Sequence, residues 1–343
     1  MDGTEFLFLF ADCCLFLLKL GPSHVKKRVA RLLLSAFNRV IGRRYAMQYA
    51  IFKKIVGYSP DAACPFRYHD KMLWRKIFDR NPIFGTFCDK LATKDYVRQR
   101  TSGIRMPETL WMGDSVRDIP ASLLVEKVVI KCNHGCDYNF FWEPGISKLE
   151  DADRATKTWM AQTYGEWNME WGYWGVRKKI FVEGFVAGRG EFLDINIRCA
   201  DGKPLLTSVI LNNKTEQMTF GYFNPDGTRL ELDRTADHAF YESGVLPMAY
   251  QVPPAFHDAV QFAGILSKGV DYARYDFMTD GESLFAGEIT VYPTAGVSPA
   301  TKKGCIGPHT LVEREWDLTA SWFLQTRQRG WRRVYAALLR SAL

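Results

Sequence analysis

The chain has 343 residues, of which 47% are hydrophobic and 14% aromatic. This length exceeds one average domain, and the apolar content is sufficient for a packed core, which excludes a largely disordered chain. The formal net charge is +7. Residues 1–60 carry this whole excess, with ten Lys and Arg against Asp2, Glu5 and Asp12. We therefore expect a globule without net charge that carries a basic N-terminal segment.

The N-terminal segment bears on where the protein acts. Residues 6–20 are apolar but short for a membrane-spanning helix, and Asp12 and Lys19 interrupt them. No basic region precedes them and no clear cleavage pattern follows, so we expect no secretion signal and a cytoplasmic protein. The eight cysteines lack a paired spacing and are predicted to be reduced thiols. Cys132 and Cys136 flank His134, but no second pair stands nearby to complete a zinc site.

Residues 25–41 have the period of an amphipathic helix with a basic polar face. The predicted apolar face comprises Val25, Val29, Leu32, Leu33, Ala36, Phe37 and Val40. Such a helix could lie on the anionic inner face of a membrane, or pack on the protein's own core with its basic face in solvent. Both interpretations remain open from the sequence.

The rest of the chain alternates between helical and extended segments. The regions predicted to be helical are 69–103 with a break at Asn81-Pro82, about 150–163, 255–269 and 316–343. The regions predicted to be extended are 104–113, 125–132, 140–142, 179–186, 191–213 and a hairpin over 274–290. The polar stretch 214–250 is predicted to be loop. This order predicts an α+β fold of small mixed sheets with helices on one side.

The hairpin over 274–290 contains two acids among apolar residues. Its Asp-Gly turn at 280–281 would bring Asp276 and Glu288 side by side on neighbouring strands. Two carboxylates so close repel each other unless a cation lies between them, and oxygen ligands suit Mg²⁺. Thr290 shares a face with Glu288 and could join the site. A salt bridge from these acids to Arg274 or to a lysine is the alternative.

Other polar residues are candidate nucleotide ligands. Lys131 ends a strand that runs into the loop at 133–139, so its ammonium and the loop amides could meet a phosphate. Lys90 lies in a helix, and Lys94 follows one turn later. Glu183 ends a short strand and Asp194 begins the next, where they could bind ribose hydroxyls or lie at a strand edge. Individually these residues are weak indicators.

In this order the segments resemble the TupA-like branch of the ATP-grasp superfamily over about residues 65–318. The matching segments are 71–97, 129–135, 182–185, 194–204 and 284–296. The resemblance implies an ATP-grasp fold, in which two small α+β lobes sandwich ATP, with an N-terminal helical basic extension. The implied parts are 61–115 as an N-terminal helical region, 116–186 as the lid lobe and 187–318 as the C-terminal lobe with the Mg²⁺ site. Charge and helical period add 1–60 as a basic amphipathic extension and 319–343 as a basic C-terminal helix.

The resemblance implies an ATP-dependent carboxylate–amine ligase that forms an acylphosphate and releases ADP and phosphate. It implies a cell-surface polysaccharide or its precursor as the carboxylate acceptor and an amino acid or other amine as the donor. The implied roles are Mg²⁺ binding by Asp276, Glu288 and Thr290, ATP binding by Lys90, Lys131, His134, Gly135, Glu183 and Asp194, and catalysis by Arg274, Lys131 and Arg198.

Two departures from the family pattern bear on the phosphate site. The loop after Gly135 continues with Cys136 and Asp137, where the family has smaller residues. Asn196 stands where the family has a lysine, and Arg198 on the same strand face could substitute for it. The alternatives are a phosphotransferase that stops after phosphorylating its acceptor, and a nucleotide-binding scaffold at the membrane. Nucleic-acid binding is not expected, because basic residues gather only in the two terminal segments and no recognition motif accompanies them.

Overall fold

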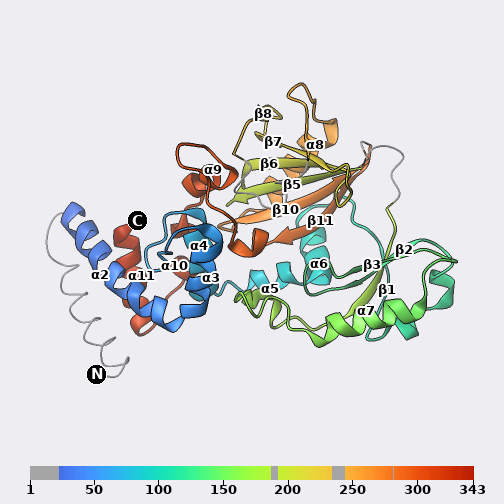
Figure 1. Cartoon of the computed structure of the whole chain (residues 1–343), viewed down its shortest axis with the longest axis horizontal. Helices are drawn as coiled ribbons and strands as arrows, with labels where there is room; N and C mark the ends of the chain where they lie inside the picture. The colour runs from blue at the N-terminus through green and yellow to red at the C-terminus, as the bar shows by residue number, and fades with distance from the viewer. Residues whose placement is uncertain (1–22, 187–191, 234–243, 281) are drawn as a thin grey trace.

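The computed structural model describes residues 23–186, 192–233, 244–280 and 282–343, so the apolar segment 6–20 and Gly281 of the hairpin turn lie outside the described residues. Two sheets, antiparallel except for the parallel β7–β9 pair, and a group of helices near both chain ends make up the structure (Figure 1). Within the described ranges no helix is long and apolar enough to cross a membrane. The six cysteines in those ranges are all free thiols.

The small sheet has four strands in the order β1-β4-β2-β3. Its elements are β1 (Thr109–Gly113), β2 (Val128–Cys132), β3 (Asn139–Trp142), β4 (Ile180–Gly184) and the covering helix α7 (Leu149–Ala161). Ile130 and Val182 pack in the core with Ala152 of α7. Because side chains alternate along a strand, Lys131 and Glu183 lie on the opposite face, away from α7. β1 pairs with β4, so residues before 116 also contribute a strand to this sheet.

The large sheet has the order β11-β10-β5-β6-β7-β8, and β9 pairs with β7. Its strands are β5 (Leu193–Ala200), β6 (Lys203–Leu211), β7 (Thr219–Phe223), β8 (Arg229–Leu230), β9 (Gly244–Val245), β10 (Ala273–Thr279) and β11 (Leu284–Thr290). One face is buried against the helices α5 (Ile83–Cys88), α6 (Lys90–Arg100) and α8 (Pro254–Leu266). The prediction of loop over 214–250 is wrong for β7, β8 and β9. Phe220 and Tyr222 alternate along β7 and pack on Leu206 and Ile210, and this burial outweighs their polar surroundings in the sequence.

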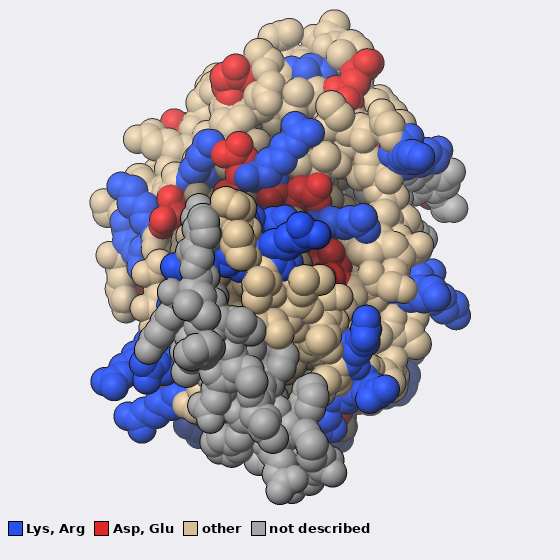
Figure 2. Space-filling view, turned by 90° about the vertical axis from the view of Figure 1, so that its left-hand side faces the viewer, with Lys and Arg blue, Asp and Glu red and all other residues tan. Residues whose placement is uncertain are grey.

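The remaining helices form a single group, which we call the helical unit. It comprises α2 (Ser23–Arg44), α3 (Ala46–Val56), α4 (Tyr68–Ile77), α10 (Trp322–Gln325) and α11 (Trp331–Ala342), and α9 (Pro308–Glu315) packs beside α4. The unit lies at one end of the molecule (Figure 1) and faces the viewer in Figure 2. Segments from both ends of the chain therefore share one core, and the basic extension and the C-terminal helix are not separate parts.

The amphipathic helix predicted over 25–41 is α2, and it packs on the protein's own core. Its buried residues are Ala30, Leu34, Phe37 and Ile41. Leu33 and Val40 pack partly against the same core, as predicted, but Val25 is 40% exposed and Leu32 is 67% exposed. The assignment of these last two residues to the apolar face is wrong, because contact with α11 selects a stripe that is rotated around the helix.

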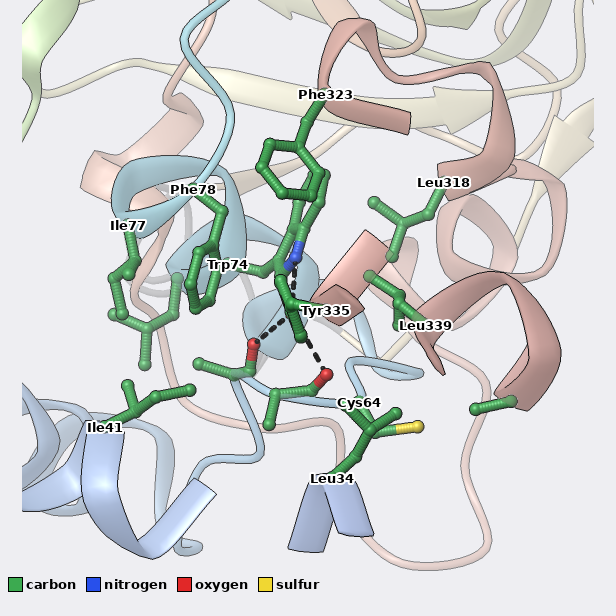
Figure 3. Close-up of a cluster of buried hydrophobic side chains, with 14 of the residues drawn as sticks. Leu34, Ile41, Cys64, Trp74, Ile77, Phe78, Leu318, Phe323, Tyr335 and Leu339 are labelled. Carbon is green, nitrogen blue, oxygen red and sulfur yellow. Dashed lines mark hydrogen bonds between the residues drawn. The ribbon is translucent and has the colours of Figure 1, made fainter. Parts of the chain in front are cut away.

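Aromatic side chains fill the core of the helical unit (Figure 3). Trp74 Nε1 donates a hydrogen bond of 2.9 Å to the Tyr335 hydroxyl, which itself donates to the carbonyl of Ala63 at 3.0 Å. Phe78 and Phe323 pack against the same tyrosine. These contacts tie α11 to α4, so the C-terminal helix is an integral part of the fold.

A buried arginine fastens the helical unit to the large sheet. Arg75 of α4 is fully buried, and its Nη2 lies 2.9 Å from Asp271 Oδ2, just before β10. Its Nη1 donates to the carbonyl of Val291, just after β11, at 3.1 Å. Trp316 Nε1 donates to the same Asp271 oxygen at 2.9 Å. The two ends of the β10–β11 hairpin are therefore anchored by one side chain.

Candidate active site

The β10–β11 hairpin places its two acids next to each other. Tyr275 pairs with Ile289 and Phe277 pairs with Ala286, so between them Asp276 faces two residues, Gly287 and Glu288. This arrangement is a β-bulge, which re-aims a side chain without ending the strand. The carboxylates thus lie on neighbouring strands at the end of the hairpin that Arg75 anchors.

Asp276 is engaged by its neighbours on the same sheet face. Arg274 Nε and Nη2 donate to Asp276 Oδ1 and Oδ2, each at 2.7 Å, which is a bidentate pair. Thr290 Oγ1 donates to Asp276 Oδ2 at 3.2 Å. The salt-bridge alternative from the sequence therefore describes Asp276 in this structure, and the Thr290 hydroxyl binds the same carboxylate.

Glu288 contacts a lysine from a helix. Lys90 Nζ lies 2.8 Å from Glu288 Oε1, and the Glu288 side chain is 44% exposed. Partial burial raises the pKa of Glu288, but the Lys90 and Lys131 ammonium groups outweigh this effect and hold the pKa below its usual value. Burial likewise disfavours charge on Lys90, yet the Glu288 carboxylate raises the pKa of Lys90. Both groups are therefore charged at neutral pH.

The loop after β2 reaches the same lysine. Lys90 Nζ donates to the carbonyl of Gly135 at 2.6 Å, and the Lys90 backbone N–H donates to the carbonyl of Asn133 at 2.9 Å. Asn133 Nδ2 donates to Asp89 Oδ1 at 2.9 Å, and Asp89 also caps the first turn of α6. Lys90 thus joins the small-sheet loop to the large-sheet hairpin.

His134 lies in this loop, but its side chain does not face Lys90. Its Nε2 lies 3.0 Å from the carbonyl of Trp159 in α7, and its ring packs on Tyr138. Burial lowers the pKa of His134, which favours the neutral imidazole. Any contact of His134 with a nucleotide would involve its backbone.

Gly135 is predicted to be intolerant of a side chain. Its φ is +96°, and an added Cβ would lie 2.7 Å from Tyr164 Cδ2. For Gly135→Ala we expect a lower free energy of unfolding and at least about tenfold weaker binding of a non-hydrolysable ATP analogue, because the loop must move away from Lys90. Urea unfolding and calorimetric titration measure the two effects.

Gly145→Ala is the matched control for this substitution. Gly145 also has a left-handed φ, +78°, but nothing lies within 4 Å of an added Cβ. It should show only the backbone cost, about 1–2 kcal/mol, with unchanged affinity for the analogue. Equal affinity losses in the two variants would contradict the steric argument.

Two lysines flank Glu183 on the face of the small sheet opposite α7. Lys131 Nζ and Lys94 Nζ each lie 2.5 Å from a Glu183 oxygen. Lys94 is buried, which lowers its pKa although the Glu183 carboxylate acts in the opposite direction. The sequence placed Lys94 one helical turn after Lys90 among the candidate nucleotide ligands, but it did not indicate the contact with Glu183.

Asp194 and Arg198 lie on β5, beside β10. Asp194 accepts a hydrogen bond from Asn213 Nδ2, and burial raises its pKa. Arg198 is 3% exposed, lies opposite Arg274 in the strand register, and donates to Ser208 Oγ at 2.9 Å. Arg198 therefore lies beneath the open surface, which limits its direct contact with a substrate.

A further ion pair connects the two sheets, and the sequence did not predict it. Lys214, in the loop after β6, lies 2.5 Å from Asp137 in the loop after β2. The Lys214 ammonium lowers the pKa of Asp137. The acid that departs from the family pattern is thus neutralised by a cation from the opposite sheet.

The oxygen atoms of this site fit a hard divalent cation that takes most of its ligands from water and phosphate. Within the described ranges no group of three His, Cys, Asp or Glu side chains could hold a metal. Asp276, Glu288 and Thr290 instead supply two carboxylates and a hydroxyl, and Mg²⁺ commonly uses one or two carboxylates with water and phosphate oxygens. Glu288 has the more accessible carboxylate, since Arg274 binds both oxygens of Asp276. A small cavity beside it is lined by Lys90, Thr93, Tyr173, Gly287 and Thr290 among others.

The model of the family described as TupA-like ATPgrasp matches residues 70–305. This range contains both sheets and every residue of the candidate site. The chain belongs to the TupA-like ATP-grasp family. The recognised family and the predicted α+β ATP-grasp fold with its N-terminal helical region are thereby confirmed.

The solved structures that are similar to this member of the TupA-like ATP-grasp family share little sequence with it. They include D-alanine–D-alanine ligase from Bacillus anthracis complexed with ATP (18% identity, 60% of this chain and 55% of that chain, TM-score 0.33), L-amino acid ligase from Bacillus licheniformis (16%, 61% and 44%, 0.37) and ATP-grasp ligase PsnB complexed with a minimal precursor (13%, 68% and 61%, 0.36). The chain thus spans less than two thirds of each of these proteins. No curated protein matches it. Family membership rests on the family model.

Proposed function

We propose that this protein is an ATP-dependent ligase that joins a carboxylate to an amine. The observation that carries the proposal is the contact of Lys90 with both Glu288 and the carbonyl of Gly135. It brings the polar hairpin of one sheet against the loop of the other, and Lys131 lies on the face of the small sheet opposite α7. A polyphosphate held between two such surfaces would meet cations on one side and metal-binding oxygens on the other.

The proposed chemistry has two balanced steps. A carboxylate oxygen of the acceptor attacks the γ-phosphorus of ATP, which forms an acylphosphate as the bond to ADP breaks. The amine nitrogen then attacks the acyl carbon, the bond to phosphate breaks, and the nitrogen loses a proton. The products are a C–N bond, ADP and phosphate.

The residues have distinct proposed roles in these steps. Lys90 and Lys131 orient the phosphates, and Lys94 keeps Glu183 in place near the adenine and ribose. Asp194 would accept from a ribose hydroxyl. The proposed Mg²⁺ ligands are Asp276, Glu288 and Thr290, and bound Mg²⁺ supplies positive charge at the phosphate oxygens. Arg274 would stabilise the acylphosphate directly. Because Arg198 is buried, it would act through Arg274, which lies opposite it in the strand register.

We further propose that the acceptor is a cell-surface polysaccharide or its precursor and that the donor is an amino acid or another amine. This substrate class follows from the resemblance to the protein of teichuronopeptide biosynthesis that gives the family its name. Such polymers are assembled at the inner face of the membrane, so we place the protein in the cytoplasm and at that surface.

Analysis of nucleotide products tests the reaction class. Purified protein is incubated with ATP, Mg²⁺ and a panel of uronic-acid oligosaccharides and amino acids, and ADP and phosphate are quantified. A ligase releases both only when carboxylate and amine are present together. A phosphorylated acceptor that accumulates without amine would favour a phosphotransferase. ATP binding without turnover under every condition would favour a scaffold.

A further inference from the structure

The helical unit concentrates positive charge at one end of the molecule. Residues 23–56 contain nine Lys and Arg, residues 326–343 contain five, and neither segment contains Asp or Glu. These 14 bases are part of a total of 45, which leaves 31 bases against 38 acids in the rest of the chain. The charge of the protein is therefore strongly polarised, because these two segments carry 14 positive charges and the whole chain has a net charge of +7.

Folding brings the two basic segments together. α2 packs against α11, so cations from both ends of the chain share one surface. The exposed basic residues of the unit are Arg28, Arg31, Arg39, Arg43, Arg44, Lys53, Lys54, Arg327, Arg329, Arg332, Arg333 and Arg340. In Figure 2, which faces this end, Lys and Arg side chains flank the lower part of the view, and most visible Asp and Glu side chains lie above them.

Two cations of α2 donate hydrogen bonds to the C-terminal end of α11. Lys27 Nζ donates to the carbonyl of Leu343 at 2.6 Å, and Arg31 Nε donates to that of Ala342 at 3.2 Å. Both satisfy carbonyls at the C-terminus of α11, where the helix dipole favours positive charge. The basic surface is thus held rigidly by the fold, and its other cations project from a fixed framework.

Apolar side chains project among these cations. Leu32 of α2 is 67% exposed and Met47 of α3 is 58% exposed, whereas the ring of Trp331 packs on Phe37 and Phe78 of the core. Leu32 also lines a surface hollow with His24, Lys27, Arg28 and Arg31. A surface that recognised only a polyanion would have no use for exposed Leu and Met. Interfacial helices, in contrast, combine Lys and Arg with apolar and Trp side chains that enter the headgroup region.

We propose that the helical unit docks this folded protein on an anionic lipid bilayer through the basic surface of α2, α3 and α11. On α2 this surface is the outer side of the helix, because the apolar stripe of α2 is already buried in the core. The basic residues attract anionic headgroups, and the exposed Leu32 and Met47 side chains enter the interface. This inference does not depend on the ligase chemistry.

Vesicle co-sedimentation of the full chain tests the proposal. We expect binding to vesicles of phosphatidylcholine with 30% phosphatidylglycerol at about 0.1 M NaCl, and loss of binding as salt screens the charges. Each cation near the surface contributes about fivefold in affinity, so Arg332→Glu with Arg333→Glu should weaken binding by at least about 25-fold. Strong binding to pure phosphatidylcholine, or binding unaffected by this variant, would overturn the proposal.

The control reverses two exposed lysines outside the unit, Lys268→Glu with Lys303→Glu. It changes the net charge equally, and we expect affinity within about twofold of wild type because these lysines lie off the docking surface. Thermal unfolding verifies that both variants fold. Equal losses in the two double variants would mean that net charge alone attracts the protein, which contradicts a defined surface.

Leu32→Ser separates a bilayer from a nucleic acid as the partner. It leaves the charge unchanged and should weaken binding to the anionic vesicles by about tenfold, since an inserted apolar side chain is lost. Binding to a single-stranded RNA oligonucleotide tighter than to the vesicles, together with no effect of Leu32→Ser on either, would overturn the membrane assignment.

Discussion

Glu288→Gln is expected to lower the turnover of ATP by about 10²–10³-fold or more, with little effect on the fold. The amide keeps the shape of the side chain but removes the negative charge that would face Mg²⁺, and it removes the charge partner of Lys90. The Lys90–Glu288 pair is partly exposed, so its loss should cost less than about 1 kcal/mol of stability. Release of ADP in the presence of the active substrate pair measures the effect.

Glu282→Gln is the matched control. Glu282 lies on the same hairpin beside the turn, is exposed, and belongs to neither sheet face of the candidate site. It should retain wild-type turnover. If Glu288→Gln kept turnover within a few-fold of Glu282→Gln, the hairpin would not be the metal-binding element, although the ATP-grasp fold would be unaffected.

The largest effect on stability is expected for Arg75→Met. This change leaves the buried Asp271 carboxylate without its cation and removes the donor to the carbonyl of Val291. Breaking a buried pair from one side typically costs about 3–5 kcal/mol, because an uncompensated charge stays in the interior. Urea unfolding should show this loss.

The comparison pair for Arg75 is Arg98, which lies 2.9 Å from Asp95 on the exposed side of α6. Arg98→Met should cost less than about 1 kcal/mol, since solvent screens an exposed pair. Adding Asp271→Asn to Arg75→Met should recover part of the loss, because the second change removes the orphaned charge. Strictly additive losses in the double variant would contradict a direct coupling between the two side chains.

Much of the fold could be predicted from local sequence pattern. The hairpin over 274–290, the strand pair over 191–213 and the broken helical region over 69–103 correspond to β10–β11, β5–β6 and α4–α6. Side-chain alternation and turn residues identify such elements because they act over a few neighbouring residues. The order of polar residues along these elements also identified the family before any contact was known.

The short strands at the edge of the large sheet could not be predicted from the sequence. β7, β8 and β9 lie in a stretch of polar composition, and Phe220 and Tyr222 are apolar in only a short alternation. β7 depends on pairing with β6 and on packing against Leu206 and Ile210, and β8 and β9 in turn pair with β7. Short strands have little intrinsic preference, so the neighbouring strand determines them.

The sequence by itself determined that acids occur in alternation on one hairpin, that lysines precede them on other elements, and that both termini are basic. Only the tertiary structure decided that Lys90 contacts Glu288, that Lys94 joins Lys131 at Glu183, and that α2 turns its basic side outward. The physical reason is how far apart in the sequence the interacting residues lie. Alternation and helical period depend on neighbouring residues, whereas ion pairs and the buried stripe of a helix depend on partners brought together by chain reversal.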